Sequence, residues 1–270
     1  MLGVPLFERD RHGVRVTTAG AQVIERARAL LVSADDLVDA AARFADPFAG
    51  TLRIGAIPTV APYLLPDVAA ALRARYPALT VVWVEDRTAG LAARLVAGEL
   101  DAALVALVPE LGGFDHADVG RDPFLLATPP AHPLSRSSSP ARADEIDGER
   151  VLLLDDGHCF REQALEFCAR TGATELGFRA TSLATLTQMV AGGAGVTLLP
   201  RLAAATENRR GELHLRAIAP RTPFRTLALV WRKGSAMAEA LSSIAGTMRE
   251  AYERREPLLE KATTVRRRNR

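Results

Sequence analysis

From residue 51 onward, apolar segments of strand-like length alternate with amphipathic segments of helical length, and this alternation limits the possible folds more than any other feature. The order strand, helix, strand, helix, strand predicts an α/β fold with a mainly parallel sheet and helices on both faces. The predicted strands are 52–57, 80–84 and 101–107, and the predicted helices are 62–76 and 89–97. Ligands of such sheets bind beyond the carboxyl ends of the strands, where Thr59 and Thr88 follow the first two strands.

A second unit of the same kind follows a polar run of Ser, Pro and Arg residues over 135–143. Its predicted elements are strands over 151–154, 178–180 and 196–199 and helices over 159–170 and 182–191. A further strand over 227–231 and a closing helix over 236–254 return the chain to the first unit. We therefore expect one lobe from residues 51–124 and 228–256, a second from 125–227, and a pocket in the cleft between them.

The segment before residue 51 has a different pattern. Two short strands are predicted around a turn at His12-Gly13 within residues 1–18, followed by a helix of about 25 residues within 19–46. The apolar stripe of this helix runs nearly end to end but lacks strict heptads. We expect the same helix of a second chain to cover the stripe, and packing on the chain's own domain is the alternative.

Composition fits a globular protein, because 48% of the residues are hydrophobic and 24% are charged. No segment approaches the roughly 20 apolar residues of a membrane span, and the first residues lack a signal-like apolar core. We expect no membrane contact and a cytoplasmic location, where thiols are kept reduced. The histidines have no metal-like spacing, so we expect no metal and no cofactor, and the Arg-rich residues 257–270 are predicted to form a flexible basic tail.

The two cysteines define the candidate chemistry. Cys159 is predicted at the start of a helix, a position that favours the thiolate, with His158 beside it. Cys168 follows on the same predicted helix, on the opposite face and roughly 13 Å farther along the axis. Because a disulfide needs the two Cα atoms within about 7 Å, a bridge requires the intervening turns to unwind. The pair is therefore either two incidental buried thiols or a switch.

Oxidation by a peroxide fits the second interpretation. A thiolate converts to a sulfenic acid, which a second thiol condenses into a disulfide, and a cellular dithiol later reverses the reaction. Hydroxyl groups and a cation near the reacting sulfur accelerate such a step by holding the departing oxygen.

Four segments resemble a known family. LGVPLFERDRHGVRVTTAG, residues 2–20, resembles the wing and the start of the linker helix of LysR-type transcriptional regulators. Three further segments resemble the effector domain of the OxyR group of that family: IGAIPTVAPYLLP over 54–66, DGHCFREQALEFC over 156–168 and FRATSLATLTQMVAGGAGVTLLP over 178–200. The resemblance covers nearly the whole chain apart from its last residues.

The resemblance implies a remnant of a winged helix-turn-helix domain, a long linker helix and a two-lobed effector domain of the periplasmic-binding-protein kind. It implies a regulator of antioxidant genes, not an enzyme, that works as a dimer or tetramer on promoter DNA and RNA polymerase. A thiol reductant such as a glutaredoxin or thioredoxin would reset it.

The resemblance also assigns roles to individual residues. Cys159 matches the peroxide-reacting position and Cys168 the resolving one. His158, Thr59 and Thr88 match positions around the peroxide. Arg232 is our candidate for the cation near the thiolate, with Arg161 and Arg179 as rivals.

The start of the chain departs from the family pattern, in which a recognition helix precedes the wing. By that comparison we expect about forty residues to be absent, so that the chain senses and dimerises but binds operators weakly. Arg9 and Arg11 in the wing are the expected phosphate contacts, which give salt-sensitive binding without sequence choice.

Three alternatives stay open. In the first, a LysR-type regulator binds a small organic effector in the interlobe cleft and the cysteines are incidental. In the second, the chain is a solute-binding protein of the same two-lobed architecture. In the third, it is a thiol peroxidase that turns over with a reductant, and steady-state peroxide consumption would distinguish such an enzyme from a sensor.

Overall fold

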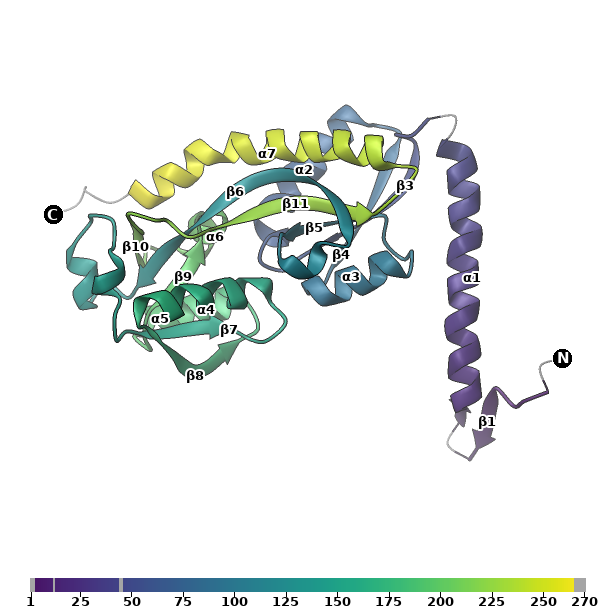
Figure 1. Cartoon of the computed structure of the whole chain (residues 1–270), viewed down its shortest axis with the longest axis horizontal. Coiled ribbons are helices and arrows are strands. Elements are labelled where there is room, and N and C mark those ends of the chain that lie inside the picture. The colour runs from purple at the N-terminus through teal and green to yellow at the C-terminus, as the bar shows by residue number, and fades with distance from the viewer. Residues whose placement is uncertain (1–2, 12, 44–45, 265–270) are drawn as a thin grey trace.

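The computed structural model describes residues 3–11, 13–43 and 46–264. A hairpin of β1 (Phe7–Asp10) and β2 (Gly13–Val16) precedes the long helix α1 (Thr18–Arg43), as the sequence predicted, although His12 of the expected turn lies outside the described residues. Thr17 caps α1, because its Oγ1 accepts a hydrogen bond from the backbone N–H of Gly20 at 2.9 Å. Figure 1 shows α1 standing beside the two lobes, with the hairpin at its far end.

Lobe I contains three parallel strands, β3 (Gly50–Ala56), β4 (Leu79–Glu85) and β5 (Ala102–Ala106). Helix α2 (Ala61–Arg75) connects β3 to β4, and helix α3 (Thr88–Val96) connects β4 to β5. The apolar faces of these helices supply fully buried side chains such as Leu64 and Leu91, which pack against strand residues such as Leu104 of β5 in the core of the lobe. Parallel pairing brings the carboxyl ends of these strands to one edge of the sheet, where the loops that carry Thr59 and Thr88 begin.

Two antiparallel strands make the sheet mixed, whereas the alternation predicted a mainly parallel sheet. The long strand β6 (Phe114–Thr128) and the returning strand β11 (Phe224–Arg232) pair with each other, and β11 pairs with β5. The sequence did not reveal β6, because charged residues such as Asp115 and Arg121 interrupt its apolar pattern where one face is exposed to solvent.

Lobe II is built on the far end of β6. Its elements are β7 (Arg150–Leu154), α4 (Cys159–Thr171), β8 (Thr174–Ala180), α5 (Leu183–Ala191), β9 (Thr197–Pro200), α6 (Arg201–Glu207) and β10 (His214–Ala217), with short 3-10 helices over Pro133–Arg136 and Ala143–Glu145. A third short 3-10 helix, Pro109–Leu111, lies in lobe I between β5 and β6. Strands β9 and β10 pair with β6, and β7 pairs with β8 in parallel. The predicted helices and strands of this lobe are present, and α6 and β10 are additions.

Strand β6 changes its pairing strand near the predicted boundary between the lobes. Pro123 of β6 still pairs with β11, whereas Phe124 already pairs with β9. On the return, β11 pairs within lobe I from Phe224, which is earlier than the expected boundary at 227/228. The helix α7 (Ala238–Thr264) then lies along lobe I and continues past residue 257, where we expected a flexible tail, because strong helix formers such as Leu258 and Glu260 follow.

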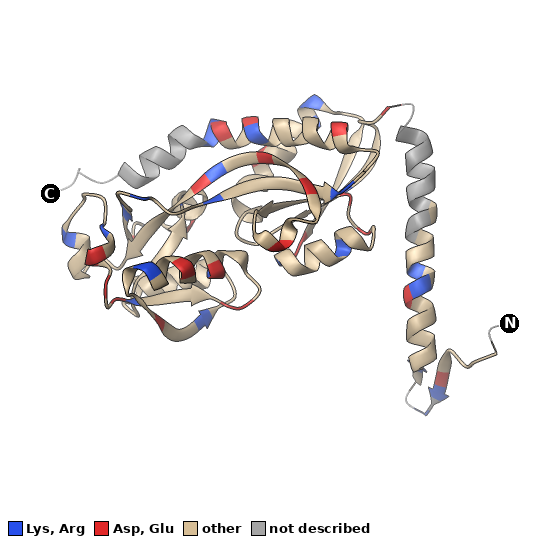
Figure 2. Cartoon of the chain, viewed as in Figure 1, with Lys and Arg blue, Asp and Glu red and all other residues tan. Residues whose placement is uncertain are grey.

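The surface shows no large region of one charge in the view of Figure 2, where acidic and basic residues alternate over both lobes. Among the described residues, no helix is long and apolar enough to cross a membrane. Four of the predicted site residues instead lie at the interface between the lobes.

Candidate redox site at the interface of the lobes

Three segments meet at a small, tightly closed pocket between the lobes. Lobe I contributes the loop after β3, with Ile57 and Thr59, and the start of α3, with Thr88. Lobe II contributes His158 and Cys159 at the start of α4. Thr59, His158 and Cys159 are 3%, 5% and 6% exposed, so the pocket holds its polar groups away from bulk water. The structure thus brings together four of the predicted site residues.

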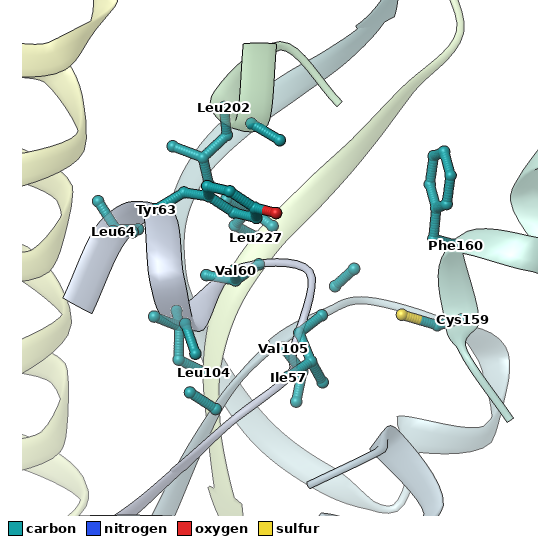
Figure 3. Packing of buried hydrophobic residues seen from close by; sticks show 14 of the residues in the cluster. Ile57, Val60, Tyr63, Leu64, Leu104, Val105, Cys159, Phe160, Leu202 and Leu227 are labelled. Atoms are coloured by element: carbon teal, nitrogen blue, oxygen red, sulfur yellow. The ribbon is translucent and has the colours of Figure 1, made fainter. Parts of the chain in front are cut away.

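The turn before α4 determines how Cys159 is presented. Gly157 has a φ of +85°, which places it in the left-handed region that favours glycine, and His158 is extended at the N-cap. Cys159 is the first residue of α4, and its sulfur points toward the loop that carries Ile57 (Figure 3). The reactive atom therefore faces lobe I, while the next residue, Phe160, is fully buried.

Two polar atoms of the pocket lining have no hydrogen-bond partner although they are buried, namely Thr88 Oγ1 and His158 Nε2. A buried polar group without a partner costs about 1–3 kcal/mol, so such atoms point to a small polar ligand. The pKa of His158 lies below its usual value, first because the ring is buried and then because the guanidinium of Arg87 is near, which outweighs the opposing effect of Asp155. The ring is therefore neutral at pH 7 and keeps one nitrogen able to accept a proton.

Arg225 supports the pocket from β11. Its Nη1 donates to Thr59 Oγ1 at 2.7 Å and its Nη2 donates to the Thr59 carbonyl at 2.9 Å. Its Nε pairs with Asp122 Oδ2 at 3.0 Å, and both side chains of this pair are 0% exposed. The guanidinium carbon also lies 6.0 Å from the ring centroid of Phe160, the residue after the reactive cysteine. Because the Thr59 oxygen accepts from Arg225, its hydroxyl hydrogen is free to face a ligand.

Asp122 connects this ion pair to lobe II. Its Oδ1 accepts a hydrogen bond from the backbone N–H of Leu202 in α6 at 2.9 Å. Complete burial raises the pKa of Asp122 despite the neighbouring Arg225. The carboxylate thus depends on its two partners, and the ion pair joins β6, β11 and α6 beneath the pocket.

Cys168 lies in different surroundings on the same helix. It is 4% exposed, is not part of the pocket lining, and has its pKa raised by burial and, to a lesser extent, by Glu175. Helix α4 is continuous from Cys159 to Thr171 and ends at Gly172, whose φ is +74°. Both thiols are free, and the helix separates them by roughly 13 Å along its axis, as the sequence predicted.

Arg232, which we predicted as the cation near the Cys159 thiolate, does not line the pocket. Its Nη1 donates to the carbonyls of Leu95 and Leu100 at 2.7 and 2.8 Å, at the end of α3. Because β11 is antiparallel to β5, its first residues and not its last ones reach the edge where the pocket lies. The arginine of β11 that contacts the pocket lining is therefore Arg225, through Thr59, and not Arg232.

The two rival arginines form ion pairs around the start of α4. Arg161 pairs with Asp156 and Glu175 at 2.9 Å each, and Arg179 pairs with Asp156 at 2.5 Å. Neither lines the pocket. In the hairpin, Arg9 and Arg11 are exposed. Among the residues that the structure describes, no cluster of His, Cys, Asp or Glu could hold a metal ion.

The sequence pattern of the LysR substrate binding domain matches residues 45–253, which contain both lobes. The chain belongs to the LysR family. A probable hydrogen peroxide-inducible genes activator of Mycobacterium leprae (strain TN) is 43% identical over 247 residues, which cover 90% of this chain and 79% of that protein. The DNA-binding transcriptional dual regulator OxyR of Escherichia coli (strain K12) is 41% identical over 250 residues, covering 92% and 81%.

A solved structure agrees with these relatives. A mutant of Corynebacterium glutamicum OxyR with hydrogen peroxide bound has a TM-score of 0.77 and 32% identity, covering 99% of this chain and 86% of that one. The resemblance of the sequence to the OxyR group of LysR-type regulators is thus confirmed, together with the two-lobed fold.

In this LysR-family chain, sequence reasoning placed Arg87 beside Thr88 where a ligand would sit, without a role, and it missed Asp122 and Arg225 as parts of the site. An arginine in an apolar strand, as in Phe224-Arg225-Thr226-Leu227, signals a buried ion pair, because a buried guanidinium needs an acidic partner. The sequence does not say which acidic residue provides that partner. Arg87 carried no signal beyond its place after a strand.

Proposed function

We propose that the chain senses hydrogen peroxide through a reversible disulfide between Cys159 and Cys168 and regulates transcription accordingly. The observation that carries the proposal is the pocket in which Cys159 meets Thr88 Oγ1 and His158 Nε2, two buried polar atoms without partners. A hydrogen peroxide molecule has two donors and two acceptor oxygens and can satisfy both atoms once the tightly packed lining moves slightly apart. The C. glutamicum OxyR mutant is described as binding the same molecule.

The first step is attack of the Cys159 thiolate on one oxygen of the peroxide. The S–O bond forms as the O–O bond breaks, so the sulfur becomes a sulfenic acid and hydroxide leaves and is protonated to water. The neutral ring of His158 supplies a proton acceptor for the thiol, and the hydroxyls of Thr59 and Thr88 hold the peroxide. Arg225 orients Thr59 through its two hydrogen bonds and favours the charge that develops on the departing oxygen.

The second step joins the two cysteines. The Cys168 sulfur attacks the sulfenic sulfur, the S–O bond breaks, and a second water leaves, so that two thiols are oxidised and one peroxide becomes two waters. Because the helix holds the sulfurs apart, residues 158–172 must unwind for the bond to form. The contacts of Phe160, including its edge-on packing against Phe124 at 5.1 Å, are lost in exchange. This rearrangement is the conformational signal.

The size of the pocket argues against an organic effector at this position. Sites for drug-sized ligands usually measure about 300–1,000 Å³, whereas this pocket is tightly closed, so a molecule little larger than water needs a far smaller displacement of its lining than an organic effector does. The buried atoms without partners also lie beside the thiol and not elsewhere in the lining. An incidental role for Cys159 would leave this arrangement unexplained.

We further propose how the signal reaches DNA. The exposed Arg9 and Arg11 of the hairpin contact phosphates, and α1, with Leu30 and Leu31 72% and 67% exposed, pairs with a second copy of the chain. RNA polymerase is the proposed partner at the promoter, and a dithiol reductant such as a glutaredoxin or thioredoxin resets the disulfide. The chain reacts once for each signal and does not turn over as an enzyme.

The test is intact-mass and thiol-labelling analysis of the reduced protein after brief exposure to micromolar hydrogen peroxide. We expect rapid loss of both thiols and a mass lower by two hydrogen atoms. Cys168→Ser should stop at a sulfenic acid that dimedone traps, and Cys159→Ser should keep its remaining thiol. If both thiols of the wild-type protein stay reduced, the peroxide function is excluded.

A further inference from the structure

Arg87 reaches from lobe I across the mouth of the pocket. Its Nη1 donates to the carbonyl of Asp156 at 2.7 Å, and its Nη2 lies 3.6 Å from the carboxylate of Asp155. Both partners belong to the turn that leads into Cys159. A single side chain of lobe I therefore holds the segment of lobe II that presents the reactive thiol.

The position of Arg87 also makes it part of the outer wall. The groups at the inner end of the pocket are almost completely buried, whereas the Arg87 side chain is 42% exposed. Gly157, which also lines the pocket, is exposed as well. The pocket thus meets solvent where Arg87 crosses Gly157.

Gly157 is adapted to this crossing. A Cβ atom on Gly157 would lie 3.2 Å from Arg87 Cδ and 3.4 Å from its Nη1, so a side chain there would press the arginine aside. The absence of a side chain lets Arg87 lie close to the turn and reach the Asp156 carbonyl. The charge of Arg87 and the opposing charge of Asp155 are also the two charged groups that affect the pKa of His158, after burial.

We propose that Arg87 is a specificity-determining residue that closes the pocket over Cys159, so that the site accepts hydrogen peroxide and excludes bulky organic hydroperoxides. This inference rests on the proposed function. Arg87 acts through position: it holds the Asp155–Gly157 turn against lobe I and fills the space through which a larger substituent on the peroxide would enter. Its removal opens the pocket and loosens the turn.

The test compares two oxidants on the full chain carrying Cys168→Ser, so that only the first step is followed. Second-order rate constants for sulfenic acid formation are measured by dimedone trapping, with hydrogen peroxide and with cumene hydroperoxide. We expect Arg87→Ala to lower the ratio of the two rate constants by roughly tenfold, which corresponds to about 1.4 kcal/mol. Arg87→Lys should give an intermediate ratio, because it keeps the charge and length but loses the planar fork.

Arg94→Ala is the matched control. Arg94 lies in α3, forms an exposed ion pair with Glu99, and has a side chain that is 37% exposed, similar to Arg87. Its ratio should equal that of the unchanged background. An equal ratio in Arg87→Ala, with the same melting temperature, overturns the role of Arg87 alone, whereas a background protein that reacts with neither oxidant overturns the proposed function itself.

Discussion

The two ends of helix α4 hold the same chemical group in opposite surroundings. Cys159 begins the helix and lines a pocket that both lobes build, whereas Cys168 lies near its end, buried close to Glu175 of β8. The first sulfur lies in the lining of this pocket, and the second lies outside it and has its pKa raised by burial. Under the proposed function, this difference makes Cys159 the thiol that meets the oxidant first.

The largest expected effect comes from replacing Arg225, which supports the pocket at the Cys159 end of α4 through Thr59. Arg225→Leu leaves Asp122 as a buried carboxylate without its ionic partner, so we expect the free energy of unfolding to fall by about 3–5 kcal/mol. Urea denaturation measures this change. The surface pair of Arg75 and Glu250, whose side chains are 53% and 52% exposed, is the control, and Arg75→Leu should cost less than about 1 kcal/mol.

A double variant separates lost charge pairing from lost packing. Replacing Asp122 and Arg225 together by leucine should recover part of the loss, because no unpaired charge remains buried. Equal stability of Arg225→Leu and Arg75→Leu would show that the pocket end does not depend on the buried pair, and the contrast between the two ends of α4 would then need another cause.

The second effect concerns the equilibrium between dithiol and disulfide. Arg161 anchors the pocket end of α4 through Asp156, Glu175 and the carbonyl of Leu154, with a side chain only 7% exposed. These contacts belong to the continuous helix that disulfide formation disrupts. Arg161→Gln should therefore favour the disulfide by about tenfold, which makes the reduction potential about 30 mV more negative.

Titration in glutathione redox buffers measures that shift, and Arg170→Gln provides the control. Arg170 lies on the same helix near Cys168, and its pair with Glu166 is exposed and 3.9 Å long. We expect its midpoint to match the wild type. Equal midpoints for both variants would mean that the anchor at the pocket end is kept in the oxidised protein.

The sequence predicted some residues around Cys159 better than others. Thr59 and Thr88 follow neighbouring parallel strands of one sheet, whose ends share an edge, so their proximity followed from the alternation. His158 and Cys159 follow β7 of a separate sheet, and their meeting with the two threonines was implied by the family resemblance. Arg225 could not be found in this way. It arrives on an antiparallel strand, whose beginning lies at the edge where the parallel strands end.

The missed strand has a related cause. Strand β6 carries charged residues on an exposed face, and its apolar residues become continuous only from Phe124, where the strand enters lobe II. Without β6, Asp122 had no assigned position, and the buried ion pair could not be inferred. Side chains that act across long sequence separations depend on strand direction and pairing, which local patterns do not encode.

A third prediction concerns how the free energy of unfolding depends on pH through Cys168, near the end of α4. Burial raises the pKa of Cys168 above its usual value of 9.0, so the folded protein keeps this proton at a pH where the unfolded chain has lost it. Stability from this group is complete below pH 9 and is lost as the pH rises, by at most about 1.4 kcal/mol for each pH unit. The free energy of unfolding, measured under reducing conditions between pH 8 and about 10.5, should decrease less steeply in Cys168→Ala than in the wild type.

Cys159→Ala, the corresponding change at the pocket end, serves as the comparison. Other buried groups such as Tyr63, whose pKa is raised by burial and by its hydrogen bond to Glu207, titrate in the same direction and are present in all three proteins. Parallel curves for the wild type and Cys168→Ala would show that this thiol is less protected in solution than its burial implies.

The smallest expected effect lies at the pocket end and has the opposite sign. Burial and Arg87 lower the pKa of His158 below 6.5, so the unfolded chain binds this proton more readily. Stability from this group is therefore present above about pH 6.5 and is lost as the pH falls toward the lowered pKa. His158→Gln should remove this decrease between pH 7 and about 5, whereas His116→Gln, at a side chain that is 48% exposed, should not.

Arg87→Gln removes one of the two causes of the lowered pKa of His158 and should give an intermediate curve, which links the charge state of the pocket to the arginine proposed to close it. If His158→Gln follows the wild type throughout, the ring is not held neutral by its surroundings, and another group must accept the proton of Cys159.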